Sequence, residues 1–340
     1  MRIAVITNAY PPKARGGAGR IAQKQVELLR AAGHEVKVWI GSLDWISYPA
    51  PIRLSFHSMD LVYPFPFVKE INAWNPDVLM THNLTGCGWS TPSMIQRKGT
   101  MWVHVLHDVQ LFEPSGSLVS AESVTWWQQL WTSLRRPVFS TPDVVVSPTK
   151  WLLDQHVRRG WFHDVPSVVL PNPAPQKQEK GERSATPKIL FVGRFDKDKG
   201  SDMLRSLVQQ IPGPVEWQFV GGGTQTMTTV STSEDVSIVA YGMCEEDKIL
   251  TLMREADVLL VPSQIEENQP TVILEAMACG LPVIAADKGG ISETLNGAGV
   301  ILPANDHQAW KKAIQDLLAQ RDAQEHREAM SRAWERFSPD

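Results

Sequence analysis

The sequence has few cysteines, no long apolar run and no surplus of basic residues. Its three cysteines, Cys87, Cys244 and Cys279, are an odd number without metal-ligand spacing, which indicates neither a disulfide framework nor a zinc site. The formal net charge of −4 argues against a protein that coats nucleic acid. No stretch approaches the roughly 18 to 20 apolar residues of a membrane-spanning helix. Because a strand-like run at 3–7 follows the first residues directly, we expect no signal peptide and a cytoplasmic protein.

The chain is long enough for two domains and ordinary in composition. Its 340 residues exceed what one hydrophobic core usually organises. With 43% hydrophobic and 21% charged residues and no biased tract, the whole chain is expected to fold.

The first half opens with a pattern typical of a Rossmann-like unit. The run at 3–7 is followed by a loop containing Gly16 and Gly17, and apolar residues then recur at helical spacing until Gly33. The apolar run at 36–40 completes a β–loop–α–β unit whose first turn suits a phosphate. Further short apolar runs follow at 77–81, 101–106 and 144–147.

Prolines and a charged run at 171–187 interrupt this pattern, which restarts at 188–192. Further strand-like runs lie at 217–220, 237–240, 258–261, 282–286 and 300–302. We therefore predict an α/β protein with two Rossmann-like domains and a cleft between them. The first domain is expected at 1–175, the linker at 176–187 and the second domain at 188–340.

Two glutamates eight residues apart, Glu267 and Glu275, follow the apolar run at 258–261. A loop that leads from the carboxyl end of a strand into a helix presents backbone N–H groups and a positive dipole end to an anion, such as a nucleotide diphosphate. Glu267 can then accept hydrogen bonds from sugar hydroxyls, and Glu275 from a ribose diol. The alternative for any such pair is a capping acid and a solvated helix residue.

This segment resembles the E-x7-E signature of the family 4 glycosyltransferases, which are retaining enzymes of GT-B fold, and the resemblance covers nearly the whole chain. The loop from Gly193 to Gly200 resembles the family's G-R-x(4)-K-G loop, whose cations bind the donor diphosphate. Arg194 and Lys199 are those residues here. Independently, two cations at the mouth of an α/β cleft suit phosphate oxygens and stabilise charge on a departing diphosphate.

The same loop contains a nominal D-x-D at Asp196 and Asp198, the spacing that binds a metal–diphosphate in the other large transferase fold. We interpret both carboxylates as solvated loop charges. The resemblance implies that cationic side chains take the place of Mg²⁺, so we expect neither a metal nor another cofactor.

The resemblance also assigns residues of the first half and of the nucleotide pocket. His107 ends a strand-like run and matches a family position near the donor sugar and the reacting centre; His104 is expected in the core. The residues that the resemblance places against the donor are Gly16, Gly17, Gly193, Gly222, Met243, Asn268, Gln269, Thr271, Val272 and Glu275. The residues that it places at the reaction are Glu267, His107, Arg194 and Lys199.

Two positions depart from the family pattern. Residues 268–270 read Asn-Gln-Pro where the family commonly has Gly-Phe-Gly, and Pro270 removes one amide donor. Pro173 follows Asn172 where the family ordinarily has glycine. The first departure leaves the detailed phosphate contacts open, and the second is expected to stiffen the linker.

Ten of the thirteen tryptophans precede residue 162, among them Trp126, Trp127 and Trp131, which Arg135 and Arg136 follow. A surface helix presenting Trp and Arg suits a membrane and a lipid-linked acceptor. The alternative is aromatic packing between a helix and the sheet.

These observations predict a retaining glycosyltransferase that moves a hexose-type sugar from a UDP- or GDP-sugar to a hydroxyl of a glycan or lipid-linked acceptor, in polysaccharide or glycoconjugate biosynthesis. The donor would bind the second domain and the acceptor the first. Three alternatives stay open: a GT-B-type nucleotide-sugar epimerase, a non-catalytic sugar-nucleotide or glycan-binding protein, and a dinucleotide oxidoreductase, which lacks a clear G-x-G-x-x-G.

Overall fold

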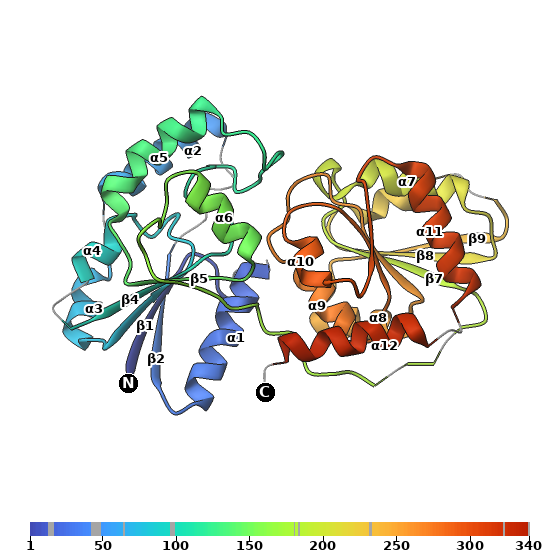
Figure 1. The fold of residues 1–340 in the computed structure, drawn as a ribbon, viewed down its shortest axis with the longest axis horizontal. Coiled ribbons are helices and arrows are strands. Elements are labelled where there is room, and N and C mark those ends of the chain that lie inside the picture. Colours follow the sequence, from blue (N-terminus) through green and yellow to red (C-terminus); the bar gives the residue numbers. More distant parts are fainter. Residues whose placement is uncertain are drawn as a thin grey trace. The chain divides into compact units, whose positions relative to one another are not determined.

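The computed structural model describes residues 1–12, 17–41, 49–63, 65–95, 99–179, 181–182, 184–230, 233–321 and 324–338, without the side chains of residues 50, 51, 53 and 54. The chain divides into two compact units, Met1–Pro171 and Asn172–Asp340. Each unit has a six-stranded parallel sheet with helices on both faces (Figure 1). Two Rossmann-like α/β units are therefore confirmed.

The sheet of the first unit has the order β2-β1-β3-β4-β5-β6. Its strands are β1 (Arg2–Thr7), β2 (Glu35–Ile40), β3 (Val78–Thr81), β4 (Met101–Val105), β5 (Val144–Ser147) and β6 (Ser167–Val169). Because the chain moves from β1 outward to β2 and then back to β3 on the other side, the order reverses at the carboxyl ends of β1 and β3. Open α/β sheets bind ligands beside such a reversal.

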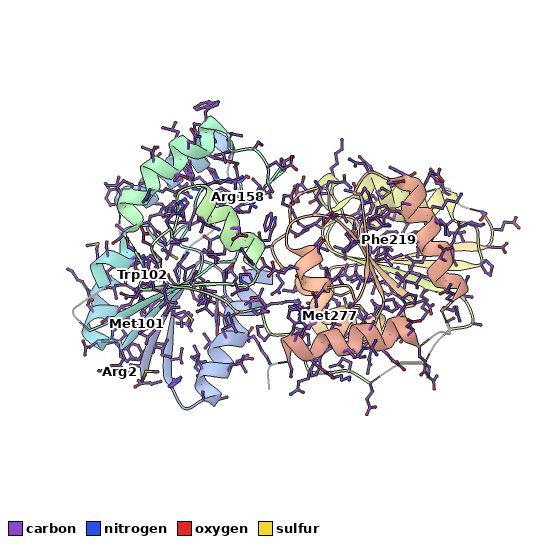
Figure 2. All side chains as sticks on the ribbon, viewed as in Figure 1. Arg2, Met101, Trp102, Arg158, Phe219 and Met277 are labelled. Atoms are coloured by element: carbon purple, nitrogen blue, oxygen red, sulfur yellow. The ribbon has the colours of Figure 1, made fainter. Side chains whose placement is uncertain are left out.

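The helices of the first unit are α1 (Gly17–Ala31), α2 (Ala50–Val62), α3 (Val68–Trp74), α4 (Thr91–Ile95), α5 (Trp126–Phe139) and α6 (Lys150–Arg158). Alternate residues of β1 point to opposite faces: Ile3 and Val5 pack with Val26 of α1, whereas Ala4 and Ile6 join the larger core on the other face. Fully buried Trp102 lies within that larger core (Figure 2).

The sheet of the second unit has the order β12-β11-β10-β7-β8-β9. Its strands are β7 (Lys188–Val192), β8 (Val215–Val220), β9 (Val236–Gly242), β10 (Val258–Val261), β11 (Val283–Ala286) and β12 (Val300–Leu302). β7 pairs with β8 on one side and β10 on the other. The carboxyl ends of β7 and β10 therefore meet where the strand order reverses, which brings two distant loops together.

The helices of the second unit are η2 (Lys197–Lys199), α7 (Ser201–Gln210), η3 (Thr224–Thr229), α8 (Glu246–Glu255), α9 (Thr271–Ala278), α10 (Ile291–Leu295), α11 (His307–Ala319), α12 (Glu325–Trp334) and η4 (Glu335–Phe337). α7 and α11 cover one face of the sheet, and α8, α9 and α12 cover the other (Figure 1). Fully buried Phe219 and Met277 lie in the cores on these two faces (Figure 2).

The segment after Pro171 packs on the second unit. Ala174 is fully buried there, and its N–H donates to the Phe337 carbonyl at 2.8 Å. Trp334 Nε1 donates to the Pro175 carbonyl at 2.8 Å, and the Gln178 N–H to the Ala278 carbonyl at 2.8 Å. The division between the units thus falls a few residues before the end predicted for the first domain at 175.

Candidate functional site

The site on the second unit is built by the loops that follow β7, β8 and β10. Gly221 has φ 128°, and a Cβ at that position would overlap the Gly193 carbonyl oxygen. Gly200 has φ 83°, and a Cβ there would overlap the Pro262 carbonyl oxygen. Glycine is required at both positions because backbone lies directly on backbone. These two contacts fix the loop after β7 between the other two loops.

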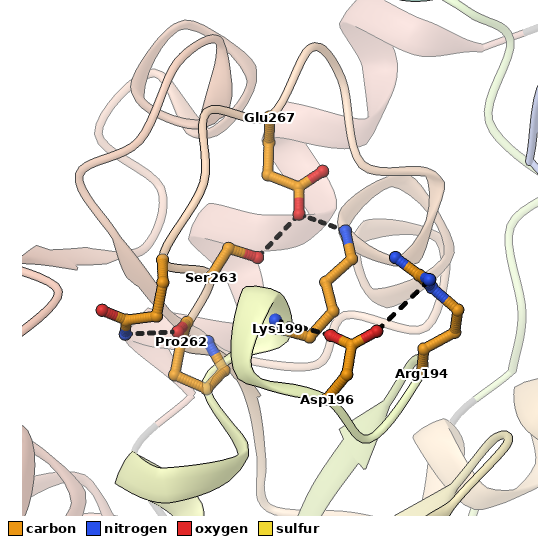
Figure 3. Close-up of polar contacts among 7 residues, drawn as sticks. Arg194, Asp196, Lys199, Pro262, Ser263 and Glu267 are labelled. Carbon is orange, nitrogen blue, oxygen red and sulfur yellow. Dashed lines mark hydrogen bonds and ion pairs between the residues drawn. The ribbon is translucent and has the colours of Figure 1, made fainter. Parts of the chain in front are cut away.

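Lys199 and Glu267 meet directly between these loops (Figure 3). Lys199 Nζ forms a short ion pair with Glu267 Oε1, and Ser263 Oγ donates to the same oxygen at 2.6 Å. The exposed fractions are 27% for the lysine side chain and 14% for the glutamate side chain, whereas Ser263 is buried. The pair therefore lies at a half-buried surface, where a ligand can reach both charges.

Arg194 and Asp196 complete this group (Figure 3). Arg194 Nη1 lies 3.3 Å from Asp196 Oδ2, and Asp196 Oδ1 accepts the Lys199 backbone N–H at 3.0 Å. Asp196 thereby caps the η2 turn that carries Lys199. The Asp196 side chain is 36% exposed, as expected for a loop charge, and in addition it orders the cationic loop.

The backbone of Glu267 is held by the loop after β11. The Gly290 N–H donates to the Glu267 carbonyl at 2.7 Å. Gly289 has φ 60°, and a Cβ there would overlap the same carbonyl oxygen. Lys288 Nζ also lies 3.7 Å from Glu266 Oε1. The position of the Glu267 carboxylate is thus set from two sides, by Ser263 and by these glycines.

The second glutamate and the residues between the two follow in helix α9. Glu275 is buried, with 6% of its surface exposed, so it is not the solvated helix residue of the alternative interpretation. Thr271 and Val272 form the first turn of α9, whose N-cap, Pro270, makes no side-chain hydrogen bond. Gln269 is buried, and its Oε1 accepts the Asn172 backbone N–H at 2.7 Å. Its side chain thus contacts the segment in which Pro173 departs from the family pattern.

The predicted nucleotide region gathers beside the loop after β7. The Gly222 carbonyl accepts the Phe195 N–H at 2.8 Å, and a Cβ at Gly222 would lie 3.8 Å from Met243 Sδ. Met243 is exposed. The second unit therefore brings together Gly193, Arg194, Lys199, Gly222, Met243 and the segment from Glu267 to Glu275, which includes Asn268.

On the first unit, polar side chains pair across the carboxyl ends of β3 and β4. His82 Nδ1 lies 2.7 Å from His107 Nε2, and the two ring planes are inclined by 22° with centroids 5.0 Å apart. One residue further along each segment, Asn83 Nδ2 donates to Asp108 Oδ2 at 2.5 Å. His104 lies in the core, where its Nδ1 lies 2.8 Å from Thr81 Oγ1. The core position predicted for His104 is confirmed.

Burial changes the proton affinity of these groups. It lowers the pKa of His107 to about 4. Burial also holds the pKa of His82 well below its usual range, with smaller effects of His107 and His104 in the same direction. Burial raises the pKa of Asp108 to about 6, against the lowering effect of its hydrogen bonds from Gln110 and Asn83. Both imidazoles are therefore neutral near pH 7.

The first loop is described only in part. The sequence placed Gly17 in the loop that follows β1, whereas the structure makes it the first residue of α1. Gly16 lies outside the described residues.

Helix α5 has two different apolar faces. Trp131 is buried, and the guanidinium of fully buried Arg135 lies between the rings of Trp89 and Trp131, at 4.2 and 4.1 Å from their centroids. Aromatic packing between this helix and the rest of the unit is therefore confirmed for Trp131 and Arg135. Trp126 and Trp127, in contrast, are 73% and 40% exposed. The membrane interpretation stays a prediction for this exposed face.

Sequence reasoning missed His82, which directly follows β3, and Ser263, which is the second residue after β10. Parallel sheets place functional groups at such strand ends. Because Glu267 and His107 match positions of the family pattern, polar residues at nearby strand ends, such as Ser263 and His82, could have been examined as their partners. Among the described residues, no group of three or more His, Cys, Asp or Glu side chains can hold a metal ion. The expectation of no cofactor stays a prediction.

A cationic loop facing a carboxylate at the switch point of a GT-B-type sheet defines a glycosyltransferase that uses a nucleotide-sugar donor. Comparison with known families agrees. Residues 15–176 match the family described as Glycosyltransferase Family 4, and residues 186–320 match the family described as Glycosyl transferases group 1. The chain belongs to the family 4 glycosyltransferases.

Relatives and solved structures extend this similarity. The D-inositol 3-phosphate glycosyltransferase of Xylanimonas cellulosilytica is 31% identical over 283 residues, which span 72% of this chain and 64% of the relative. The α-maltose-1-phosphate synthase of Mycolicibacterium smegmatis is 26% identical over 359 residues, which span 95% of this chain and 91% of the relative.

Two solved structures share the fold. Sucrose-phosphate synthase from Thermosynechococcus elongatus has a TM-score of 0.74 at 21% identity, over 99% of this chain and 94% of that one. Anabaena HepE in complex with UDP and glucose has a TM-score of 0.67 at 19% identity, over 100% of this chain and 96% of that one.

Proposed function

We propose that the protein is a retaining hexosyltransferase that moves a sugar from a UDP- or GDP-sugar to a hydroxyl of a glycan or lipid-linked acceptor, without a metal, in polysaccharide or glycoconjugate biosynthesis. The observation that carries the proposal is the contact of Lys199 and Ser263 with one oxygen of Glu267. A cation and a hydrogen-bond acceptor, held together on rigid loops, match the two ends of a sugar diphosphate.

Donor binding exchanges the partners of this ion pair. Lys199 turns to a diphosphate oxygen, Arg194 binds a second one, and Glu267 becomes free to accept a hydrogen bond from a sugar hydroxyl. Since Lys199 and Glu267 neutralise each other beforehand, neither charge needs a solvent counterion in the free protein. The pair is thus poised for a ligand that brings both a negative group and a hydroxyl donor.

The transfer needs no side-chain nucleophile. In a front-face reaction the acceptor oxygen bonds to the anomeric carbon while the bond from that carbon to the diphosphate oxygen breaks. Because the new bond forms on the face from which the diphosphate leaves, the configuration is retained. The proton of the acceptor hydroxyl moves to the departing diphosphate. Lys199 and Arg194 stabilise the charge that develops on the diphosphate, and His107 orients the donor sugar.

A ligand-binding experiment tests the donor class. Thermal unfolding is measured with UDP, GDP, ADP or NAD, each with Mg²⁺ or with EDTA; a ligand at 100 times its dissociation constant stabilises the fold by about 2.7 kcal/mol. We expect UDP or GDP to raise the melting temperature equally with Mg²⁺ and EDTA. A response to NAD alone would support the oxidoreductase instead.

A second experiment follows the reaction. NMR of the product made from the matching nucleotide sugar gives the anomeric configuration, and an inverted product would refute the retaining mechanism. Acceptor-independent turnover would identify an epimerase, and nucleotide binding without turnover a binding protein. Loss of activity in Glu267→Gln, with nucleotide binding kept, is the expected result for a residue that contacts the sugar.

We also propose that α5 contacts the inner face of a membrane, which would bring the protein to a lipid-linked acceptor. Its outer face exposes Trp126, Trp127, Leu130 and Leu134, and indole rings favour the interface between lipid and water. The neighbouring helix α2, which contacts α5 through His57 and Trp131, exposes Met59 and Val62. Among the described residues no helix is long and apolar enough to span a bilayer.

Co-sedimentation with vesicles of anionic and neutral lipid tests this contact. Trp126→Ser combined with Leu130→Ser should abolish binding. Val168→Ser, at a half-exposed position of β6, is the control and should leave binding intact. Equal binding by both variants would place the contact elsewhere.

A further inference from the structure

The loops that follow β3 and β4 are joined by side-chain hydrogen bonds beside His107. In the first loop, Asn83 Nδ2 donates to Asp108 Oδ2 at 2.5 Å and to Gln110 Oε1 at 2.8 Å, both in the second loop. Thr85 Oγ1 donates to the same Gln110 oxygen at 2.5 Å. Within the second loop, the Gln110 N–H donates to Asp108 Oδ1 at 2.8 Å. Gln110 is therefore bonded to the residue next to His107 and to two residues of the first loop.

Two side chains from neighbouring helices hold the backbone of these loops. Asp60 of α2 accepts the Gly86 N–H on Oδ2 at 2.6 Å and the Gly88 N–H on Oδ1 at 3.2 Å. Arg135 of α5 donates from Nη1 to the Gln110 carbonyl. The two helices lie side by side (Figure 1). One helix thus binds the loop after β3, and the other binds the loop after β4.

Packing alone does not account for a guanidinium at position 135. Arg135 is fully buried between the rings of Trp89 and Trp131, and its Nε has no hydrogen-bond partner among the described residues. Burial lowers the pKa of Arg135 to about 9, although Asp60 and Asp108 act in the opposite direction. A buried charge is costly, and an apolar side chain of similar volume often replaces one without loss of stability. What the guanidinium supplies, and an apolar side chain would not, is a donor and a positive charge for the loop after β4.

These contacts determine where His107 lies. The Gln110 carbonyl is only three residues beyond His107, and the hydrogen bond from the Gln110 N–H to Asp108 closes the turn between them. A shift of Gln110 therefore moves His107 with it. Because a displacement of about 1 Å can lower a rate about 100-fold, the groups that hold Gln110 matter for any reaction in which His107 takes part.

We propose that Arg135 and Asp60 are positioning residues for the sugar transfer, which fix from α5 and α2 the two loops that place His107 against the donor sugar. Both act through His107 and not on the reacting atoms themselves. The proposal rests on the proposed function, in which His107 orients the donor sugar. Since Lys199 and Arg194 of the second unit bind the diphosphate in that function, the loss of Arg135 should change kcat and not the affinity for the nucleotide.

Arg135→Met tests the contact with the Gln110 carbonyl, because methionine fills the space between the two indole rings without a donor or a charge. We expect steady-state kinetics to show kcat lower by about 10- to 100-fold. The KM for the donor should change little. This separation of kcat from KM would not arise from a loss of folded protein alone combined with intact sites, because the matched control below removes a similar side chain.

Arg159→Met is that control. Arg159 is also buried, and its guanidinium lies 4.5 Å from the centroid of the Phe112 ring. Its hydrogen bonds go to Gln128, Gln155 and Ser123, none of which belongs to the two loops. We expect Arg159→Met to keep a kcat close to that of the wild type.

Hydrogen exchange of the ligand-free protein, followed by mass spectrometry, gives a readout besides activity. Arg135→Met should exchange faster at 106–113. Asp60→Asn, which keeps one acceptor oxygen without the charge, should exchange faster at 82–89 and should also lower kcat. Arg159→Met should exchange in both segments as the wild type does.

A wild-type kcat in Arg135→Met would overturn the proposal, and so would a lower kcat without faster exchange at 106–113. Equal loss of kcat in Arg135→Met and Arg159→Met would also overturn it, because a buried guanidinium would then act only through the stability of the unit. If Arg135→Met does not fold, Asp60→Asn decides. A wild-type kcat and wild-type exchange in that variant would overturn the proposal, and a lower kcat with an unchanged KM would support it.

Failure of the proposed function looks different. In that case His107→Ala would leave the turnover unchanged, while Arg135→Met would still exchange faster at 106–113. If only the positioning role fails, His107→Ala loses activity and Arg135→Met keeps it.

Discussion

Three buried histidines of the first unit, together with the half-buried His107, should make the fold sensitive to acid. Burial lowers the pKa of His104 to about 3 and those of His107 and His156 to about 4, and it holds the pKa of His82 well below its usual range. The folded state keeps all four neutral, but the unfolded chain protonates them once the pH falls below about 6.5. Their contribution to stability is complete above that pH and is lost as the pH falls toward 4.

Two carboxyls act in the opposite direction. Burial raises the pKa of Asp60 and of Asp108 to about 6, so the folded state binds these two protons at a higher pH than the unfolded chain does. At pH 5 the unfolded chain therefore binds four protons on histidines that the folded state does not bind. The folded state binds two protons on carboxyls that the unfolded chain does not bind. The unfolded chain thus binds two more protons in total. At about 1.4 kcal/mol per proton and pH unit, stability falls by about 3 kcal/mol per pH unit. Two pH units then remove about 5 kcal/mol, as much as the whole stability of a marginal domain.

Urea unfolding at pH 7, 6 and 5, followed by tryptophan fluorescence, measures this loss. Ten of the thirteen tryptophans precede residue 162, so the signal reports mainly on the first unit. A free energy of unfolding that stays constant or rises between pH 6 and pH 5 would refute the reasoning.

His156→Leu provides an internal control for this proton count. His156 is fully buried in α6, where its Nδ1 lies 2.9 Å from the Leu152 carbonyl oxygen. Its replacement by an apolar side chain should reduce the slope by about 1.4 kcal/mol per pH unit. The packing cost of the substitution appears separately, as the difference in stability at pH 7.

Three further substitutions test the second unit. Lys199→Ala should lower kcat by at least about 100-fold, because it removes a group that stabilises charge in the transition state. It should also abolish the thermal shift with the nucleotide. An unaltered rate would show that the ion pair takes no part in the reaction. Ser263→Ala loses one hydrogen bond to a charged acceptor, which contributes about 1.5–3 kcal/mol to stability, so calorimetry should show a lower melting temperature. Steady-state kinetics should also show a lower kcat/KM, because the Glu267 carboxylate loses one of the groups that position it. Gly221→Ala should strongly lower the melting temperature in calorimetry, because its Cβ would overlap the Gly193 carbonyl oxygen. Gly297→Ala is the control: Gly297 also has a positive φ, of 83°, but open space around it, so the substitution should lower the free energy of unfolding by only about 1 kcal/mol.

The sequence predicted much of the fold because the signals are local. Short apolar runs separated by helical periodicity identified the parallel strands, and the loops after β7 and β10 carried their own motifs. The pair of Arg194 and Lys199, and the position of Glu267 after a buried strand, could be read without knowing which strands are neighbours. Asp306 caps α11 by a contact that is also local in sequence, because its side chain accepts the Ala309 N–H at 2.9 Å.

Contacts between distant segments could not be read in this way. Periodicity does not reveal which strands lie side by side, so it could not place Ser263 and Lys199, which belong to different loops, on one oxygen of Glu267. The same holds for His82 and His107, and for Arg135, which lies against Trp89 and Trp131. The sequence by itself thus determined the two α/β units and the residue types of the donor site. Only the tertiary structure decided which side chains share a proton or a charge, because strand order sets the distances over which hydrogen bonds and ion pairs act.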